Sequence, residues 1–219
     1  LLPLPAKVAA EAQGDGQGEA FVGSSTSTGG RVHGGEIESL TQATTAGIGV
    51  RVVQGGRQGF AYAGSLDGAV IAEVLGEARD NAAYAQPEEW VGLAEPDGVE
   101  PPDVGLWRDG LAATPTERKV ELALELERAV RARDPRIVGV RVAQWGDGSG
   151  VGAVVTSTGI AVGGRSTFCH LSVQALAEEG GETKTGYGVS VGREPADVDL
   201  AEAADDAADR ATRLLGAVQ

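Results

Sequence analysis

The chain has 219 residues, of which 42% are hydrophobic but only 4% aromatic, and its formal net charge is −14. This length is enough to bury a core of Val, Ala, Leu and Ile in one large domain or two small ones. The acidic balance argues against direct binding to nucleic acid or to an anionic membrane surface, since no run of Lys and Arg is present to meet phosphates. No apolar stretch approaches the roughly 20 residues needed to cross a bilayer.

Cysteine usage and the chain start set the expected cellular setting. The single cysteine, Cys169, excludes an internal disulfide, so we expect a cytoplasmic protein. The opening residues lack a basic segment followed by a long apolar run, and no secretory signal is predicted. Because the chain begins with Leu1 and contains no Met, we expect it to be a piece of a longer protein.

The first predicted elements are a short helix and three short strands. Leu2–Gln13 has apolar residues one helical turn apart, which predicts an amphipathic helix. Glu19–Ser25, Gly30–His33 and Glu36–Thr45 are strand candidates with imperfect alternation.

The stretch Gly47–Gly64 is predicted to form a β-hairpin in which Gly55 and Gly56 supply the positive φ angles of a tight turn. Apolar residues at alternate positions would give each strand one apolar face: Val50, Val52, Phe60 and Tyr62. Directly after the hairpin, Asp67 can cap an amphipathic helix that runs to about Tyr84.

Residues 86–115 hold most of the prolines and show neither helical nor strand periodicity, which predicts an irregular connector. Trp90 and Trp107 lie within it. Because each indole carries a large apolar area, we expect the connector to be packed over the domain.

The rest of the chain is predicted to contain two helices with strands between them. A helix begins at Thr116 and ends near Arg133, where Asp134-Pro135 stops it. A glycine-rich turn is expected at residues 146–150, and a closing helix at Val198–Leu215. The strand candidates are Ile137–Trp145, Val151–Ser157, Ile160–Val162, Ser166–Ala177 and Thr183–Val191.

The two halves of the chain follow one order: a helix, antiparallel strands that include a long hairpin, then a capped helix. The hairpin turn at Glu179–Glu182 in the second half corresponds to Gln54–Arg57 in the first. The repetition could be a duplication or two similar packing solutions. The predicted fold is α+β, with a mostly antiparallel sheet and a pseudo-repeated helix–strands–hairpin–helix unit. The expected organisation is a first α+β half at 1–85, an irregular connector at 86–115 and a second α+β half at 116–219.

No self-sufficient active site is predicted. His33 and His170 are the only histidines, and Cys169 and His170 are adjacent in a strand, so their side chains would point to opposite faces. Such a pair makes neither a metal site nor a catalytic dyad, and Cys169 is expected to pack as a small hydrophobe. The segment Gly180–Thr185 ends like a phosphate loop but lacks the glycine before lysine and the helix after it. We therefore expect no catalytic residue, metal ligand or cofactor in this chain.

Two stretches carry a specific resemblance. GGEIESLTQATTAGIGVRVVQGGRQGFAYAGSLD, from Gly34 to Asp67, resembles the amino-terminal signature of the TldD/PmbA family, once described as modulators of DNA gyrase. The segment from Val154 to Asp199 resembles the second conserved portion of the same domain, in the style of the PmbA branch, also called TldE. The resemblance spans about Glu19 to Leu215.

The resemblance implies a cytoplasmic zinc-peptidase assembly that processes unfolded or modified peptides. In that family, a TldD-type subunit carries zinc on an HExxxH helix, and a PmbA-type partner lacks those ligands and completes the dimer and the substrate channel. The family's roles include maturation of ribosomally made peptides and degradation of an antitoxin. This chain ends where the family's carboxy-terminal domain would begin, so no zinc-motif residue is carried over to it.

The leading hypothesis is the N-terminal domain of a PmbA/TldE-like subunit that forms dimer interface and substrate channel with a TldD-like subunit or a second copy. The alternatives are a stand-alone module that binds extended peptides at a sheet edge, and a module used purely for assembly. For each candidate contact residue, simple strand packing or a solvated charge is the competing interpretation. The candidate interface or peptide-contact residues are Arg51, Arg57, Phe60, Tyr62, Arg165, Tyr187 and Arg193.

Overall fold

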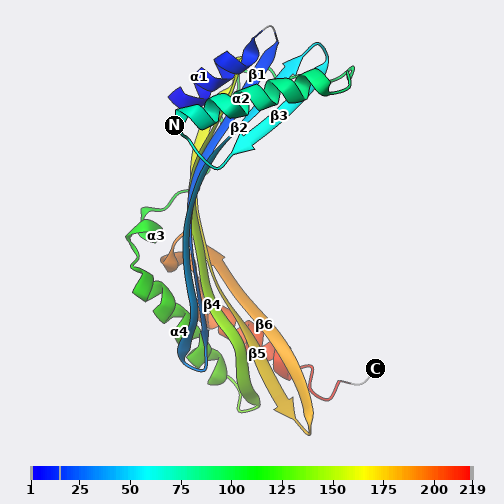
Figure 1. Cartoon of the computed structure of the whole chain (residues 1–219). Helices are drawn as coiled ribbons and strands as arrows, with labels where there is room; N and C mark the ends of the chain where they lie inside the picture. The colour runs from blue at the N-terminus through cyan, green and yellow to red at the C-terminus, as the bar shows by residue number, and fades with distance from the viewer. Residues whose placement is uncertain (1, 15, 218–219) are drawn as a thin grey trace. The chain divides into compact units, whose positions relative to one another are not determined.

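The computed structural model describes residues 2–14 and 16–217; Leu1, Asp15, Val218 and Gln219 lie outside the described residues. The strands come in two runs, β1–β3 and β4–β6, with helices before, between and after them (Figure 1). In order they are α1 (Pro3–Gln13), β1 (Gln17–His33), β2 (Glu36–Gln54), β3 (Arg57–Ala63), α2 (Gly68–Tyr84), α3 (Asp109–Ala113), α4 (Thr116–Arg131), β4 (Ile137–Thr156), β5 (Ala161–Glu179), β6 (Glu182–Gly192), the 3₁₀ turn η1 (Pro195–Asp197) and α5 (Leu200–Thr212).

The strands form one six-stranded sheet in the order β3-β2-β1-β4-β5-β6. Both predicted hairpins are present: β2 pairs antiparallel with β3 through Gln54↔Arg57, and β5 with β6 through Glu179↔Glu182. The turn glycines take the positive φ angles that these tight turns demand, 58° and 72° at Gly55 and Gly56. The prediction of an α+β fold with an antiparallel sheet is confirmed.

The strand boundaries differ from the sequence-based prediction. The candidates 19–25 and 30–33 are parts of one strand, β1, and the expected turn at 146–150 lies inside β4. The candidates 160–162 and 166–177 likewise merge into β5. These Gly-, Ser- and Thr-rich stretches were predicted as breaks because such residues favour turns, but strands with a neighbour on both sides satisfy their backbone hydrogen bonds within the sheet.

The chain divides into two compact units. Unit 1 comprises residues 2–25, 44–104 and 150–165, and unit 2 comprises residues 26–43, 105–149 and 166–217. Strands β1, β2, β4 and β5 each run through residues of both units. These compact units are not contiguous segments of sequence. The predicted division into 1–85, 86–115 and 116–219 concerns contiguous segments, and it stays a prediction.

Each unit has its own hydrophobic core on one face of its strands. In unit 1, α1 and α2 lie side by side and cover strand residues such as Val50 and Ala61 (Figure 1). In unit 2, α4 and α5 pack together over Trp145, Cys169 and Leu171. Burial of these apolar side chains is the main favourable contribution to folding in both units.

The same close contact between helix and strand occurs in both units. A side chain added at Gly59 of β3 would overlap the carbonyl oxygen of Ala78 in α2, and one added at Gly186 of β6 would overlap that of Ala207 in α5. Both helices begin at an aspartate whose side chain caps the first turn; Asp67 accepts a 2.8 Å hydrogen bond from the amide of Ala69. The two hairpins and their helices therefore match in two details: the strand glycine that meets a helix carbonyl, and the aspartate that caps the helix.

This contact explains why the predicted apolar face of the first hairpin is wrong. Val50 and Val52 are buried, but Phe60 and Tyr62 are 55% and 75% exposed and lie on the opposite face. In the register, Val50 faces Ala61 and Val52 faces Gly59, so the small residues of β3 meet the helix. A helix backbone this close leaves no room for an aromatic ring.

The connector between the halves is irregular, as predicted, apart from the short helix α3. The expectation that Trp90 is packed against the domain is wrong, because this residue is 89% exposed. Trp107 is partly covered, and its indole N–H donates a 2.7 Å hydrogen bond to Asp109.

A buried carboxylate holds the turn between β1 and β2 in unit 2. The two oxygens of Glu127 on α4 accept hydrogen bonds of 2.8 and 2.9 Å from the amides of Gly34 and Gly35, and Glu127 is only 2% exposed. Burial alone would raise the pKa of Glu127, but the Gly35 amide, the Arg131 guanidinium and the Gly34 amide together hold this pKa below its ordinary value. The ionised form is therefore the one that the fold favours.

Replacing Gly186 tests the close approach of α5. We expect Gly186→Ala to lower the free energy of unfolding by about 1–3 kcal/mol, because the added methyl group forces the helix away from β6. Gly164→Ala is the matched control, since nothing lies within 4 Å of a side chain added there. Urea unfolding of both variants measures the effect, and equal stabilities would contradict the contact.

Replacing Glu127 tests the turn clamp. At neutral pH we expect Glu127→Gln to destabilise the chain by about 1–3 kcal/mol, because one turn amide loses its acceptor. Since the folded pKa lies below the unfolded value near 4.5, the stabilisation is complete above that value and is lost as the pH falls through the folded pKa. The difference between the two proteins in urea unfolding should therefore shrink in acid; a constant difference would argue against the clamp.

Candidate functional site

Unit 1 exposes large aromatic side chains on the sheet face opposite α1 and α2. The rings of Phe60 and Tyr62 are stacked, with centroids 6.0 Å apart, and Phe21 on β1 is 51% exposed. Gly49 gives the Phe60 ring room to lie against the sheet, and Gly23 does the same for Phe21. We call Phe21, Phe60 and Tyr62 the aromatic face. Rigid aromatic side chains exposed together are typical of interaction surfaces.

Two arginines predicted as contact residues belong to the same hairpin. Arg51 lies opposite Phe60 in the register, and its Nε is 3.1 Å from a carboxylate oxygen of Glu19 on β1. Arg57 is exposed at the first position of β3, beside the turn. The structure thus brings Arg51, Phe60 and Tyr62 together and places Arg57 at the end of the hairpin.

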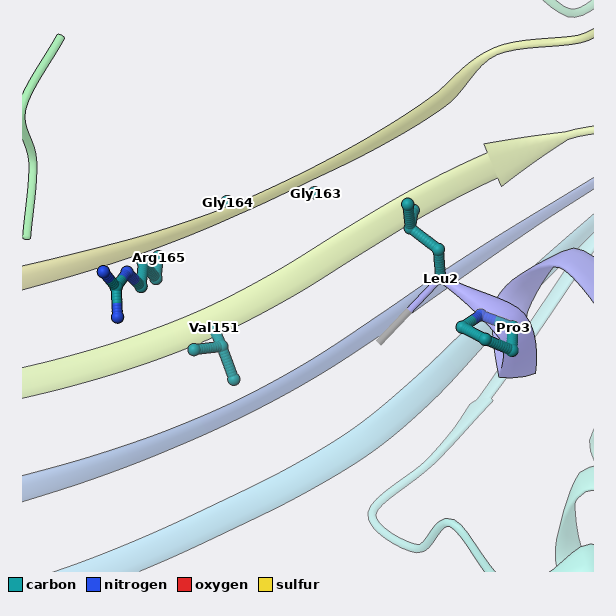
Figure 2. Close-up of a pocket in the computed structure, with 6 residues that line it drawn as sticks. All are labelled: Leu2, Pro3, Val151, Gly163, Gly164 and Arg165. Carbon is teal, nitrogen blue, oxygen red and sulfur yellow. The ribbon is translucent and has the colours of Figure 1, made fainter. Parts of the chain in front are cut away.

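Arg165 lies apart from that hairpin, on β5. It lines an open pocket of about 500 Å³ between the start of α1 and the strands (Figure 2). The lining is mainly apolar, with one guanidinium: Leu2, Pro3, Val151, Gly163, Gly164 and Arg165. The pocket is shallow and carries no second charged side chain, so it offers binding surface and no evident chemistry.

The other two predicted contact residues, in unit 2, differ in their surroundings. The Tyr187 side chain is 48% exposed, and its carbonyl oxygen accepts a 2.7 Å hydrogen bond from Arg210 on α5. Arg193 donates to the carbonyl oxygen of Thr167 at 2.8 Å, and its amide donates to Asp197. Arg193 therefore ties the end of β6 to its neighbours, and a role for either residue in partner or peptide contact stays a prediction.

A buried polar centre in unit 2 escaped the sequence-based prediction. Lys119 Nζ on α4 lies 2.8 Å from an Asp147 carboxylate oxygen, which also accepts a 2.6 Å hydrogen bond from the Trp145 indole. The Lys119 and Asp147 side chains are only 10% and 6% exposed. Because the expected turn put Asp147 in solvent, nothing in the sequence indicated this pair. Its closed geometry fits a structural role.

Cys169 and His170 lie on opposite faces of β5, as predicted. Cys169 is fully buried, and burial raises the pKa of its thiol to about 12, so it is no nucleophile. The ring of His170 covers Gly146 and lies 5.7 Å from that of Phe168. Burial lowers the pKa of His170, while the nearby Asp147 carboxylate acts in the opposite direction.

The described residues do not fit a catalytic metal. Within residues 2–14 and 16–217, no group of three or more His, Cys, Asp or Glu side chains is placed to hold one. In that same part of the chain, no helix has the length and hydrophobicity needed to cross a membrane.

Comparison with known families identifies the chain. The PmbA/TldA metallopeptidase domain 1 matches residues 18–82, and the PmbA/TldA metallopeptidase central domain matches residues 109–215. The chain belongs to the PmbA/TldD family. The first match covers the β2–β3 hairpin and α2, and the second covers the β5–β6 hairpin and α5. The resemblance to the family was recognisable in the sequence at both hairpins.

Curated relatives place the chain with PmbA. It is 28% identical over 170 residues to the metalloprotease PmbA of Escherichia coli O157:H7, which covers 77% of this chain and 37% of that protein. It is 26% identical over 161 residues to a metalloprotease PmbA homolog of Haemophilus influenzae, covering 73% and 35%. The chain therefore spans little more than a third of these PmbA proteins.

Solved structures share the fold. A Bacteroides thetaiotaomicron protein described as a candidate modulator of DNA gyrase superposes with a TM-score of 0.88 at 22% identity, covering 99% of this chain and 50% of that one. TldE from Thermococcus kodakarensis superposes with a TM-score of 0.79 at 18% identity, covering 93% and 45%. The fold of this chain thus persists where few residues are shared.

The burial of Cys169 gives a chemical prediction. We expect its thiol to react with a thiol-specific disulfide reagent at least roughly 100-fold more slowly than an exposed cysteine, because access and thiolate population are both low. A matched control places the cysteine one residue earlier, as Phe168→Cys combined with Cys169→Ala, since Phe168 is 47% exposed. Equal rates in the folded proteins would show that Cys169 is accessible.

Proposed function

We propose that this chain acts as the N-terminal domain of a PmbA/TldE-like subunit and contributes dimer interface and substrate-channel wall to a metallopeptidase assembly. Its substrates in this proposal are unfolded or modified peptides, and the assembly works in the cytoplasm. The aromatic face is the observation that carries the proposal. The family membership and the TldE-like fold support it.

The aromatic face suits an interface because its three side chains are apolar, exposed and held on strands. Phe60 and Tyr62 project from a hairpin fixed by α2, so little conformational freedom is lost when a partner covers them. The Arg51–Glu19 ion pair borders the rings and supplies a polar rim.

The catalytic zinc is proposed to belong to a TldD-like subunit. Only His33 and His170 are available as imidazole ligands, and His170 lies on the opposite strand face from Cys169. This chain would then bind and orient peptide substrate next to chemistry that the partner supplies.

Disrupting the aromatic face tests the proposal. We expect Phe60→Asp to weaken association with a TldD-like subunit at least tenfold, because a charge would be buried among aromatic contacts. Sedimentation velocity of the mixed subunits measures association, and cleavage of an unfolded peptide by the mixture gives the second readout.

Tyr84→Asp is the matched control for that experiment. Tyr84 is also an aromatic residue of unit 1 and is 89% exposed, but it ends α2 and is not part of the aromatic face. Equal association of the two variants would remove the aromatic face from the interface. A wild-type chain that forms no complex with the TldD-like subunit would contradict the assembly and favour a stand-alone binding module.

A further inference from the structure

Strand β6 (Glu182–Gly192) is a long edge strand with one open side. In the sheet order it is the last strand, and among the described residues its only strand neighbour is β5. An edge strand leaves every second residue with an amide and a carbonyl that point away from the sheet. Such a row can pair with another extended chain.

The hairpin turn fixes which residues face the open side. A two-residue turn closes with a hydrogen-bonded pair, here Glu179↔Glu182, so the outward amides and carbonyls belong to alternate residues beginning at Thr183. Tyr187 agrees with this assignment, because its carbonyl accepts its hydrogen bond from Arg210 rather than from β5. The outward residues are Thr183, Thr185, Tyr187, Val189 and Val191.

The same five residues form a stripe on the sheet face that the helices leave open. All are exposed, and the last two are Val189 and Val191 at 36% and 59%. β-branched and aromatic residues are those that pair best across strands. A strand added beside β6 would therefore gain main-chain hydrogen bonds and side-chain contacts together.

The opposite edge of the sheet is less suited to strand addition. Strand β3 has seven residues against eleven in β6. Its Phe60 carbonyl accepts a 3.0 Å hydrogen bond from Asn81, and the Gly56 carbonyl at its start accepts a 2.7 Å bond from the Glu88 amide. Short, capped edges are how proteins prevent strand pairing. On β6, the hydrogen bonds among the described residues cap one outward carbonyl of five, that of Tyr187, which Arg210 reaches.

Charge near β6 favours a basic ligand. Helix α5 packs against β6, and Arg210, which reaches the strand edge, is paired with Asp206 one turn earlier at 2.6 Å. Glu202 lies a further turn earlier on the same flank of the helix. The whole chain carries a net charge of −14. Lys or Arg side chains that alternate along an extended ligand would lie near these carboxylates.

We propose that β6 captures an extended, positively charged peptide by strand addition, pairing with the outward main-chain groups of Thr183 to Val191. The inference rests on the proposed function, because it assigns a docking strand for the peptide substrate. It adds to that function a site, a binding mode and a charge preference.

Binding of a labelled peptide to the whole chain tests the inference. The probe is a nine-residue fluorescent peptide in which Val alternates with Lys, titrated while fluorescence anisotropy is recorded. We expect saturable binding that Val189→Pro weakens at least tenfold, because proline removes an outward amide without breaking a β5–β6 hydrogen bond. A peptide with Glu in place of Lys should also bind at least tenfold more weakly.

Gln58→Pro is the matched control, because it removes an outward amide from β3 instead. Undiminished binding by that variant is expected. Two peptides with N-methyl groups on one or the other alternate set of residues provide a test on the wild-type chain if Val189→Pro does not fold. One set should abolish binding and the other should leave it unchanged.

Three results would overturn the inference: no saturable binding, equal loss with both methylated peptides, or loss with Gln58→Pro but not with Val189→Pro. Self-association of the chain that Val189→Pro abolishes would also overturn it, since a second copy would then occupy β6. Assembly with a TldD-like subunit is measured separately, so these outcomes leave the proposed function to its own test.

Discussion

The fold depends on how closely a helix backbone can approach a β-hairpin. Gly59 lies against the backbone of α2 at Ala78, and Gly186 lies against that of α5 at Ala207. At each place the absence of a side chain on the strand and the small methyl groups on the helix allow a contact that larger residues would prevent. This requirement explains the alanine-rich sequence of α5 and the glycines of β6 better than helix or strand propensity does.

The same contact determines which face of each hairpin can interact with other molecules. Since the helix side accepts only small residues, the large side chains of the edge strands, Phe60, Tyr62 and Tyr187, project from the other face. Two buried charged groups have structural partners: Glu127 holds a turn, and Lys119 pairs with Asp147. The described part of the chain therefore exposes apolar side chains on the sheet face that the helices leave open, while Glu127, Lys119 and Asp147 hold the fold together.

Local sequence signals predicted the hairpins, their glycine turns and the Asp67 cap, because each depends on residues a few positions apart. The family signature added the fold, since it lies in those same hairpins. The long central strands could not be predicted in this way. Residues 146–150 look like a turn in isolation, and only pairing with distant strands makes them extended. The face of Phe60 was missed for a related reason, since it depends on how closely α2 packs against β3.

The sequence predicted only in part which candidate contact residues the structure brings together. Alternation placed Phe60 and Tyr62 on one face with Val50 and Val52, whereas the register of the hairpin places Phe60 opposite Arg51. Alternation says nothing of a neighbouring strand, so Phe21 was not grouped with them. Arg193 was chosen for its charge; its hydrogen bonds to Thr167 and Asp197 lie within unit 2, and its role in partner or peptide contact stays a prediction. The β6 edge was found only once the strand order was known.

The central claim is that this chain supplies binding surface and its partner supplies the catalytic metal. Zinc content, measured by elemental analysis of this chain alone, of a TldD-like subunit alone and of their purified complex, tests it most directly. We predict no stoichiometric zinc in this chain, stoichiometric zinc in the TldD-like subunit, and the same amount in the complex. Stoichiometric zinc that stays with this chain alone and is removed only by a chelator would contradict the claim.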